Sequence, residues 1–531
     1  MTSVTRTRRG LVLGLAGLLA AAGAVAVLAA APITAGAAAC PALPGSLPEA
    51  GALPVVSELP DPFKFYDGTR LTSSADWNCR REQLRELLQY YEYGHLPPAP
   101  TSVTGTRNGN TLTVTVQANG RTASFNATLR LPSGNGPFPA IIMLNPLAAT
   151  ATNRGYAEVS IDPNSIASDS TAKTGAFWTA NGTTVDTGVL MAWAWGVHRT
   201  LDALGAVPQI DVTKVGVSGY SRYGKAAVVA GAFDDRIALT VPGSAGTAGM
   251  GNYRFFFTGG SNDETLNDIL GAAYWFTPRF ATFRNQATRL PIDQNSLGAL
   301  LAPRPLLITN GTEGSDIRTN PQGTGLSYRA AQMVYQYLGA RDRIGVAYRS
   351  GGHQIDINDY NAVMDFADKY VKGLAVSRTF DTVPYPAPTT AQIPWTIPSG
   401  GGPTSAPPTS SPPTSAPPTS APPTSAPPTT SAPVGACGAT YRTVNAWSGG
   451  YQGEVTVRAG TAAINGWTVR WALPAGTTIS QLWNGTYTVS GGAATVRNAT
   501  YNGSLAANAS TTFGFLGTGS PSTPTLTCTS P

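Results

Sequence analysis

"KVGVSGYSRYGKAAVVAGAFDDRIA", residues 214–238, predicts a short buried strand, a sharp Gly-Tyr-Ser-Arg turn and an Ala-rich helix. Such a turn at the carboxyl end of a parallel strand lifts one side chain above the sheet, over the positive end of the following helix. Ser221 stands at that point, so we expect it to have the exposed hydroxyl of a nucleophile elbow. The usual Gly-x-Ser-x-Gly spacing is not met, because Tyr223 precedes the next glycine, Gly224.

Two other interpretations of this segment stay open. Ser221 is also a favourable residue for capping a helix that begins near Arg222. Ser218 is a rival nucleophile on the same segment, but it belongs to the end of the predicted strand, where its side chain would be buried. A histidine base in a suitable place along the chain would favour Ser221 as the nucleophile.

The sequence around this turn predicts the sheet to which it belongs. "PAIIML" and "PLLITNG" are further continuous apolar runs, as buried parallel strands are. "NTLTVTV" (110–116) and "ASFNATLRL" (123–131) alternate apolar and polar residues, as half-buried antiparallel strands do. Residues 188–206 and 326–340 have helical patterns. We therefore predict an α/β domain of the α/β-hydrolase class, a three-layer sandwich with helices on both faces of a mostly parallel sheet.

The chain has three histidines, and their positions differ in kind. His198 lies within a Trp/Ala-rich helical pattern and is expected to be structural, while His95 lies in a loop after a helix. His353 follows the strand-like "IGVAYRS" in a Gly-Gly turn late in the chain. The α/β-hydrolases place their base there, in the chain order serine, acid, histidine. We predict that His353 is the base for Ser221.

Several carboxylates are candidates for the acid of this triad. Asp316 follows "PLLITNG" and has the expected place, after the strand that precedes the last helix and strand. Glu313 in the same loop and Asp356, just past the histidine, are alternatives. Asp316 is also a residue that can cap a helix. We predict that Asp316 completes the triad.

Composition divides the 531 residues into parts. Residues 399–434 repeat a Pro/Thr/Ser unit, which predicts an extended spacer. Arg8 and Arg9 precede an apolar run and then small residues, the order of a secretory signal peptide with cleavage near residues 37–39. A membrane anchor is the alternative, and Sec and twin-arginine export both stay open. We predict a signal peptide (1–39), a hydrolase domain (40–398), a spacer (399–434) and a β-sandwich (435–531).

The four cysteines fall into two distant sets. In an exported protein they are expected to pair, Cys40 with Cys79 and Cys437 with Cys528, one pair for each domain. The sequence has no C-x-x-C motif and no histidine cluster, so we predict no metal site and no cofactor. The net charge of +6 is small for this length and carries no basic run, so we expect no nucleic-acid partner.

With these residues in place, the N-terminal domain resembles the glucuronoyl esterases, carbohydrate esterase family fifteen. Gly219 to Lys225 resembles the family's Gly-Cys-Ser-Arg-x-Gly-Lys motif. "LPDPFKFYDGTR", "ADWNCRREQ", "GVLMAWAWGVHRTLDAL" and "LPIDQNSLGALLAPRPL" resemble other family stretches, and together they cover residues 40 to about 373. The resemblance implies hydrolysis of the ester between 4-O-methylglucuronic acid on xylan and an alcohol of lignin.

The family pattern also implies roles for residues near the elbow. Arg222 would stabilise the oxyanion through its backbone N–H and its guanidinium. Lys225 matches a lysine that contacts sugar hydroxyls, although a solvated helix lysine is the ordinary alternative. Glu264, before the family-like "YWF", is similar to a polar residue that contacts the sugar. We expect the mature enzyme to be a monomer.

This sequence departs from the family pattern at several positions. Ser244 stands where many members have a catalytic glutamate, and Arg318 stands in place of a tryptophan that contacts the sugar. Asn295 replaces a usual histidine. Some relatives link a cysteine before the nucleophile to one after the histidine, and Tyr220 and Gln354 stand at those two positions.

The C-terminal region, between Cys437 and Cys528, has short alternating strands and frequent turns, which predict a β-sandwich. "NAWSGGY", "INGWTVRW", "QLWNGT" and "NATYNGS" make it resemble the family-two carbohydrate-binding modules. The resemblance places Trp447, Trp483 and Tyr501 on an exposed planar face that stacks on cellulose. Trp467 and Trp471 are expected in the core instead.

We therefore predict a secreted, extracellular serine esterase that acts on glucuronoxylan–lignin esters and is tethered to cellulose, with no membrane attachment in its mature form. An acetylxylan or feruloyl esterase on a similar scaffold is the alternative enzyme. A binding protein whose hydrolase domain has lost its activity is the alternative from another class, because Ser244 stands where an acid is usual.

Overall fold

The computed structural model describes residues 40–257 and 263–402 in the N-terminal domain. In the C-terminal domain it describes residues 437–447, 450–474, 476–483, 485–499, 502–519 and 521–530. The predicted signal peptide (1–39) and nearly all of the predicted spacer (399–434) lie outside these residues. Among the helices that the structure describes, none combines the length and the apolar character that crossing a membrane requires.

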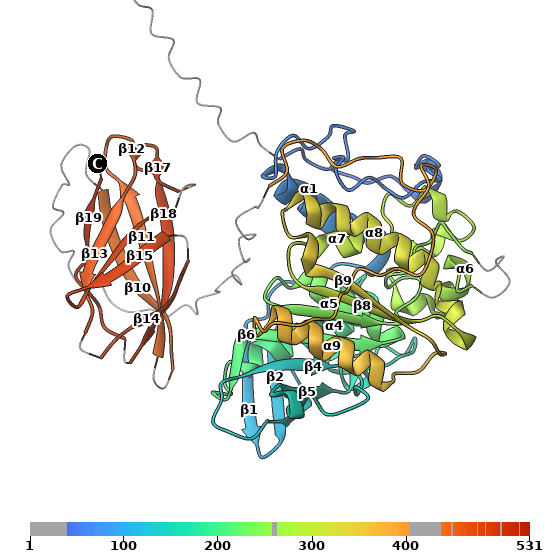
Figure 1. Cartoon of the computed structure of the whole chain (residues 1–531), viewed down its shortest axis with the longest axis horizontal. Helices are drawn as coiled ribbons and strands as arrows, with labels where there is room; N and C mark the ends of the chain where they lie inside the picture. The colour runs from blue at the N-terminus through green and yellow to red at the C-terminus, as the bar shows by residue number, and fades with distance from the viewer. Residues whose placement is uncertain are drawn as a thin grey trace, which may run out of the picture.

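A nine-stranded sheet with the order β1-β2-β3-β5-β4-β6-β7-β8-β9 forms the centre of the N-terminal domain (Figure 1). From β5 to β9 all neighbouring strands are parallel, and β1, β2 and β3 extend one edge as antiparallel strands. This confirms the mostly parallel sheet and the antiparallel pair predicted from alternation. The strands are β1 (Ser102–Asn108), β2 (Thr111–Ala118), β3 (Arg121–Arg130), β4 (Phe138–Met143), β5 (Ala157–Ile161), β6 (Ile210–Tyr220), β7 (Leu239–Gly243), β8 (Leu306–Gly311) and β9 (Ile344–Arg349).

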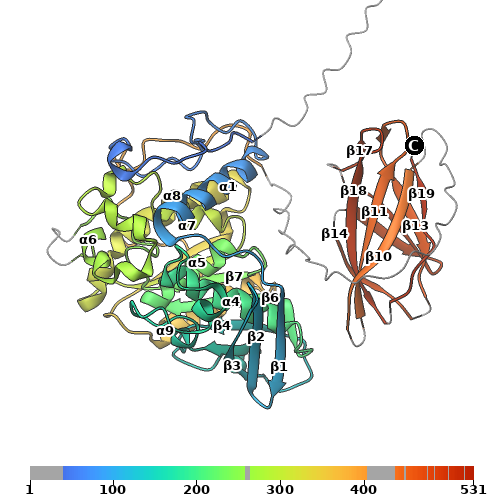
Figure 2. The same ribbon diagram turned by 180° about the vertical axis from the view of Figure 1, so that it is seen from behind.

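Helices cover both faces of this sheet, which confirms the three layers (Figure 1 and Figure 2). Ile142 and Val217 belong to the core on the side of α4 and α5, whereas Ile141, the neighbour of Ile142, belongs to the core on the side of α9. Strand β4 is thus apolar on both faces, as its continuous apolar run predicts. The helices are α1 (Asp76–Leu88), α2 (Pro163–Ile166), α3 (Ala176–Asn181), α4 (Val189–Leu204), α5 (Arg222–Phe233), α6 (Leu266–Ile269), α7 (Gln294–Leu300), α8 (Pro321–Tyr337) and α9 (Ile357–Tyr370).

The two ends of the described N-terminal domain are held against its body. A disulfide joins Cys40 to Cys79 in α1, with the Cα atoms 5.3 Å apart. At the other end, Trp395 is buried and its indole N–H donates to the carbonyl of Leu59 at 3.0 Å. The segment that follows β9 and α9 therefore returns to pack beside the start of the domain.

The C-terminal domain is a β-sandwich with its own core. One sheet has the order β10-β11-β18-β14, the other has the order β15-β16-β13-β19, and β12 pairs with β17. Trp467 and Trp471 are buried in the core, as predicted, and a disulfide joins Cys437 to Cys528. The strands are β10 (Cys437–Trp447), β11 (Gly450–Ala459), β12 (Ile464–Asn465), β13 (Thr468–Ala472), β14 (Ile479–Trp483), β15 (Gly485–Ser490), β16 (Ala493–Asn498), β17 (Ser504–Leu505), β18 (Ser510–Thr518) and β19 (Thr527–Thr529).

Candidate active site

Ser221 lies in the turn between β6 and α5, at the carboxyl edge of the sheet. Its backbone has φ 57° and ψ −128°, a conformation that side-chain-bearing residues rarely adopt and that is common at catalytic sites. The turn is so tight that a Cβ at Gly219 would lie 2.1 Å from the carbonyl oxygen of Tyr223. The Ser221 side chain makes no capping hydrogen bond to α5, and Ser218 is buried within β6. The arrangement is therefore that of an elbow and not of a helix cap.

His353 lies in the loop between β9 and α9, within reach of this serine. Its Nε2 is 2.8 Å from Ser221 Oγ, and its Nδ1 is 2.7 Å from Asp316 Oδ1. A carboxylate only accepts hydrogen bonds, so the Nδ1–H donates to Asp316 and leaves Nε2 free to accept the serine proton. The three side chains come from three different loops at the same edge of the sheet.

Asp316 is fully buried in the 3-10 turn η7 (Gly314–Thr319), which follows β8. Its second oxygen, Oδ2, accepts hydrogen bonds from Ser244 Oγ at 2.7 Å and from the backbone N–H of Gly311 at 2.5 Å. These donors compensate the loss of water around the carboxylate and fix its orientation. Ser244, which sequence analysis treated only as a missing acid, thus contacts the same carboxylate as His353 does.

The two alternative carboxylates lie elsewhere. Glu313 accepts the backbone N–H of Gly351 at 3.2 Å, and Asp356 caps α9 by accepting the N–H of Asn358 at 2.7 Å. Within the described residues neither side chain has a hydrogen bond to His353. The geometry therefore favours Asp316 among the three candidates.

The other two histidines are also accounted for by their surroundings. His198 is buried in α4, where its Nε2 bonds to the carbonyl of Ala230 at 2.9 Å and burial lowers its pKa to about 4. His95 lies between Glu86 and Asp186, and the hydrogen bond to Glu86 is the main cause that raises its pKa to about 9. Neither histidine is near Ser221 in the described hydrogen-bond network.

Arg222, the residue after the serine, has a half-exposed side chain that is bound by Asp169. Its guanidinium donates to Asp169 Oδ2 at 2.5 Å. Asp169 also accepts the Tyr274 hydroxyl at 3.1 Å and the Trp275 indole N–H at 2.7 Å. Sequence analysis missed Asp169, which belongs to no motif. The "YWF" stretch was the one available signal, although it does not reveal which carboxylate its rings contact.

Lys225 and Glu264 form an ion pair beside the elbow. Lys225 is buried, and its Nζ donates to Glu264 Oε2 at 2.9 Å and to the carbonyls of Ala245 and Thr247 at 2.8 and 2.6 Å. Burial lowers the pKa of this lysine, an effect that the charge of Glu264 opposes. Glu264 is the more exposed partner of the pair, at 29% for its side chain. The ammonium group thus orients a carboxylate that is partly exposed.

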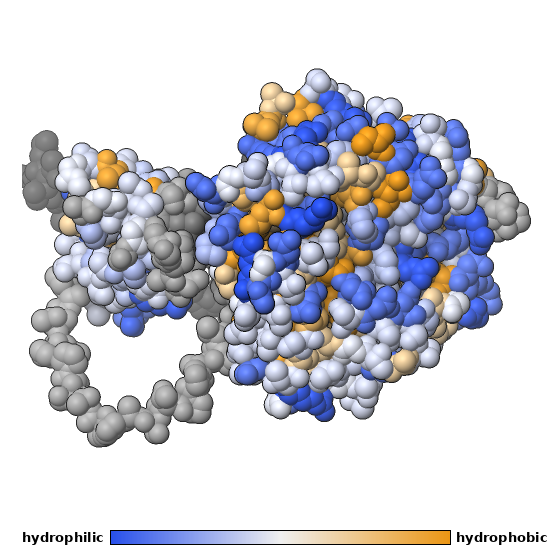
Figure 3. All heavy atoms as spheres, turned by 90° about the horizontal axis from the view of Figure 1, so that it is seen from below, coloured by the Kyte–Doolittle hydropathy of each residue, from blue (hydrophilic) through white to orange (hydrophobic). Residues whose placement is uncertain are grey.

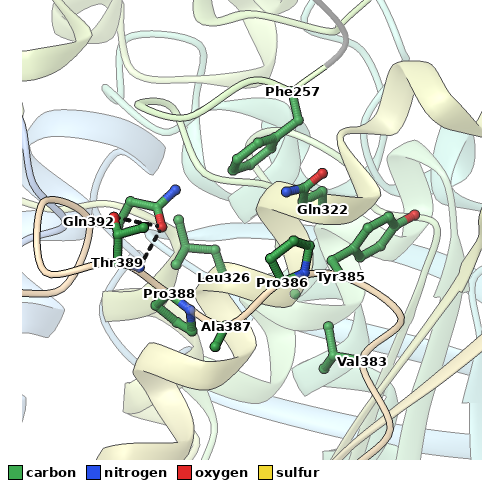
Figure 4. Close-up of a pocket in the computed structure, with 11 residues that line it drawn as sticks. Phe257, Gln322, Leu326, Val383, Tyr385, Pro386, Ala387, Pro388, Thr389 and Gln392 are labelled. Atoms are coloured by element: carbon green, nitrogen blue, oxygen red, sulfur yellow. Dashed lines mark hydrogen bonds between the residues drawn. The ribbon is translucent and has the colours of Figure 1, made fainter.

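A separate pocket of about 140 Å³ lies between α8 and residues 383–392 (Figure 4). Thr389 and Gln392 bond to one another at its rim, and Phe257 lies across it from the segment that carries Tyr385, Pro386 and Pro388 (Figure 4). It shares no residue with the triad and has no nucleophile paired with a base, so we assign it no chemistry. Among the described residues there is also no cluster of three or more side chains suited to hold a metal ion.

The predicted cellulose-binding residues are only partly described. Trp447 is the last residue of β10 and Trp483 the last of β14, two strands of the same sheet. Their side chains, and all of Tyr501, lie outside what the structure describes. The planar face that they would form stays a prediction.

Comparisons with known proteins match both domains. A family model described as "Glucuronyl esterase, fungi" matches residues 114–339, and one described as "Cellulose binding domain" matches residues 437–530. The 4-O-methyl-glucuronoyl methylesterase of Hypocrea jecorina is 35% identical over 372 residues, which cover 68% of this chain and 79% of that protein.

Solved structures resemble the N-terminal domain. A glucuronoyl esterase of carbohydrate esterase family 15 from Caldicellulosiruptor kristjansonii is 42% identical, with a TM-score of 0.61, over 66% of this chain and 99% of that chain. A mutant glucuronoyl esterase from Sporotrichum thermophile, solved in complex with methyl 4-O-methyl-β-D-glucopyranuronate, is 29% identical, with a TM-score of 0.61, over 65% of this chain and 95% of that chain.

Proposed function

Since this chain belongs to the glucuronoyl esterases of carbohydrate esterase family fifteen, we propose that it cleaves the ester between glucuronic acid side chains of xylan and lignin alcohols. The observation that carries the proposal is the hydrogen-bonded chain from Ser221 through His353 to Asp316. The relative solved with a methyl glucuronate ester supports the acid half of the substrate. Neither an acetyl nor a feruloyl ester is favoured by any relative named above.

The reaction has two steps that use the same three side chains. Ser221 Oγ attacks the uronate carbonyl while His353 Nε2 takes the serine proton, and the resulting intermediate collapses as the imidazolium protonates the departing alcohol. Water then attacks the uronoyl-serine ester, His353 again takes and returns the proton, and the free acid leaves. Asp316 keeps the Nδ1 proton of His353 in place and stabilises the imidazolium charge.

The oxyanion of each intermediate needs hydrogen-bond donors, and we assign this role to Arg222. The backbone N–H of Arg222 lies at the start of α5, where the partial positive charge of the helix is concentrated. We assign its guanidinium a second contact to the oxyanion. The ion pair with Asp169 holds this side chain at the rim, so less conformational entropy is lost when substrate binds.

The sugar is assigned to the Lys225–Glu264 pair. A carboxylate accepts hydrogen bonds from sugar hydroxyls, and the buried ammonium group fixes where that carboxylate points. Three protein acceptors already bind the Lys225 ammonium group. We therefore expect Lys225 to contribute to sugar binding mainly by orienting Glu264.

The C-terminal module is assigned to cellulose, with Trp447, Trp483 and Tyr501 as its stacking residues. Flat aromatic rings match the apolar faces of the polymer's sugars. We propose that the protein is exported through residues 1–39, acts outside the cell and is monomeric. On the one face that Figure 3 shows, hydrophobic residues (orange) lie in separate groups among hydrophilic ones.

The test compares three ester classes on one preparation of the full chain. Benzyl glucuronate should be hydrolysed, while acetylated xylan and feruloylated arabinose should react far more slowly. Ser221→Ala should reduce the glucuronate activity to background because the triad acts as a unit, and its retention on cellulose should be unchanged. Equal rates on all three esters, or an active Ser221→Ala variant, would refute the proposal.

A further inference from the structure

Arg349 is the last residue of β9, and its side chain lies within the curve of the loop that carries His353. It is 8% exposed, and its guanidinium donates to the carbonyl oxygens of Ser350 and Gly352, both at 3.2 Å, and to that of Gln354. The loop from 350 to 354 thus has carbonyls on both sides of His353 bound to one planar group. A guanidinium has five N–H donors in a rigid fork, so it can hold several carbonyls at fixed mutual positions.

The guanidinium is itself anchored to a rigid element. Its Nε donates to Asp359 Oδ2 at 2.6 Å, and Asp359 is buried in the first turn of α9. Within residues 350–354 the one backbone hydrogen bond that the structure describes runs from the N–H of Gln354 to the carbonyl of Gly352 at 2.9 Å, and the loop contains two consecutive glycines, Gly351 and Gly352. Because glycines leave the backbone freer than other residues do, the position of His353 depends on bonds from outside the loop.

Tyr220 connects this loop to the nucleophile. Its hydroxyl donates to the carbonyl of Gln354 at 3.0 Å, and its ring centroid lies 5.1 Å from that of His353. Burial raises the pKa of the phenol, so the hydroxyl stays protonated and available as a donor. The residue before Ser221 is therefore bonded to the residue after His353.

We propose that Arg349 and Tyr220 are positioning residues, which act together as a clamp that sets the distance between His353 Nε2 and Ser221 Oγ. Neither is assigned a contact with the reacting atoms. The clamp rests on the proposed roles of Ser221 and His353, and it extends them by naming what aligns the two side chains. A displacement of about 1 Å between reacting groups can cost about a hundredfold in rate.

The first test is Arg349→Lys in the full chain. A lysine keeps the charge but offers a compact ammonium group, which cannot bind Asp359 and the three carbonyls in the same plane. We expect kcat on benzyl glucuronate to fall about 10- to 100-fold with KM changed less than about threefold, because substrate contacts are untouched. Tyr220→Phe, which keeps the ring and loses the hydroxyl, should lower kcat less, by about 3- to 10-fold.

Arg304→Lys is the matched control. Arg304 also binds three backbone carbonyls, those of Gly231, Asp234 and Ile237 at 2.7, 3.2 and 3.0 Å, but it precedes β8 at the opposite end from the triad. This variant should lower the melting temperature and leave kcat within about twofold of wild type. If both arginine variants lose kcat equally, Arg349 is structural and the clamp is refuted.

A second measurement tests the alignment of Ser221 and His353 without relying on the proposed substrate. Fluorophosphonates label an activated serine without a sugar, so the labelling rate of Ser221 reports its alignment with His353. That rate should fall in parallel with kcat in Arg349→Lys and Tyr220→Phe, and not in Arg304→Lys. If folded Arg349→Lys or Tyr220→Phe is labelled at the same rate as wild type, the clamp is overturned. If wild type is labelled but cleaves no glucuronate ester, the proposed substrate fails and the labelling comparison still decides the clamp.

Discussion

The two domains of this chain use charge in opposite ways. In the α/β domain the groups that we propose as functional are titratable and largely buried, from Asp316 with no exposed surface to the Lys225–Glu264 pair. The C-terminal domain has a single acidic side chain, Glu454, which forms a surface ion pair with Arg442 at 2.8 Å. Ester hydrolysis develops charge in its transition state, so it needs oriented charges that water does not screen. A neutral polymer offers no charge to bind, and flat apolar surface suits it better.

This contrast predicts that charge-removing changes act on catalysis alone, and that ring-removing changes act on cellulose binding alone. Each prediction can either contradict this independence of the two domains or measure the size of one effect.

The largest effect is expected from Asp316→Asn. The amide keeps the shape but loses the charge, and it can present an N–H to His353 in place of an acceptor, so the imidazole is held in the wrong tautomer. Turnover of benzyl glucuronate should fall by up to about ten-thousandfold, the precedent for such a change in serine hydrolases, while retention on cellulose is unchanged.

Two neighbouring carboxylates serve as controls for that result. Glu313→Gln and Asp356→Asn remove charge from the same edge of the sheet without touching His353. Both variants should keep turnover within a few-fold of wild type. A collapse in either one, with Asp316→Asn near wild type, would assign the acid to another loop.

Next in size is a pH effect on the stability of the α/β domain, to which all three histidines belong. Burial lowers the pKa of His198 from 6.5 to about 4, so the unfolded chain takes up this proton first and the free energy of unfolding falls as the pH drops through that window. Burial raises the pKa of Glu92 from 4.5 to about 7, so the folded chain takes up that proton first and the free energy of unfolding rises as the pH drops. The two effects oppose each other between about pH 6.5 and 4.5.

Single variants should separate these opposing effects. In Glu92→Gln, the free energy of unfolding of the α/β domain should fall by about 3 kcal/mol as the pH drops from 6.5 to 4, relative to its own value at pH 6.5. In His198→Gln it should instead rise on acidification. Urea unfolding of the full chain at several pH values measures both slopes. If the two variants have the same slope as wild type, the buried groups do not titrate as described.

A smaller effect is expected from Trp483→Ala in the C-terminal domain. One aromatic ring contributes on the order of 1 kcal/mol beyond its burial, about a fivefold change in affinity. Most of the variant should be released from insoluble cellulose in a pull-down, and hydrolysis of soluble esters should be intact. Retention equal to wild type would remove Trp483 from the binding face.

The smallest effect is expected from changing pH and salt during cellulose binding. The C-terminal domain has no histidine and a single acidic side chain. Retention of the full chain should therefore be constant between about pH 5 and 8 and between 0.05 and 1 M salt, apart from a modest strengthening of apolar contacts at high salt. A steep loss at high salt would show that charge does contribute to binding.

Much of the fold follows from sequence patterns that can be recognised within a single segment, without knowing which other segments it packs against. Continuous apolar runs predicted the parallel strands, alternation predicted β2 and β3, and a serine between a strand and a helix predicted the turn at Ser221. These signals are local because a strand's exposure repeats every two residues and a sharp turn needs its glycine within a few residues. The chain order of serine, acid and histidine then placed Asp316 and His353 in loops at one edge of the sheet.

The contacts that organise those side chains were decided by the tertiary structure alone. Asp169 reaches Arg222 from 53 residues away, and Ser244 reaches Asp316 across 72 residues. Sequence analysis assigned no role to Arg349, because nothing in "IGVAYRS" shows that its guanidinium turns back onto the next five residues. Sequence determined which residues stand at the carboxyl ends of the strands, because that depends on local periodicity. Which of them donate to which depends on how separate loops converge, and that is set by the packing of the whole sheet.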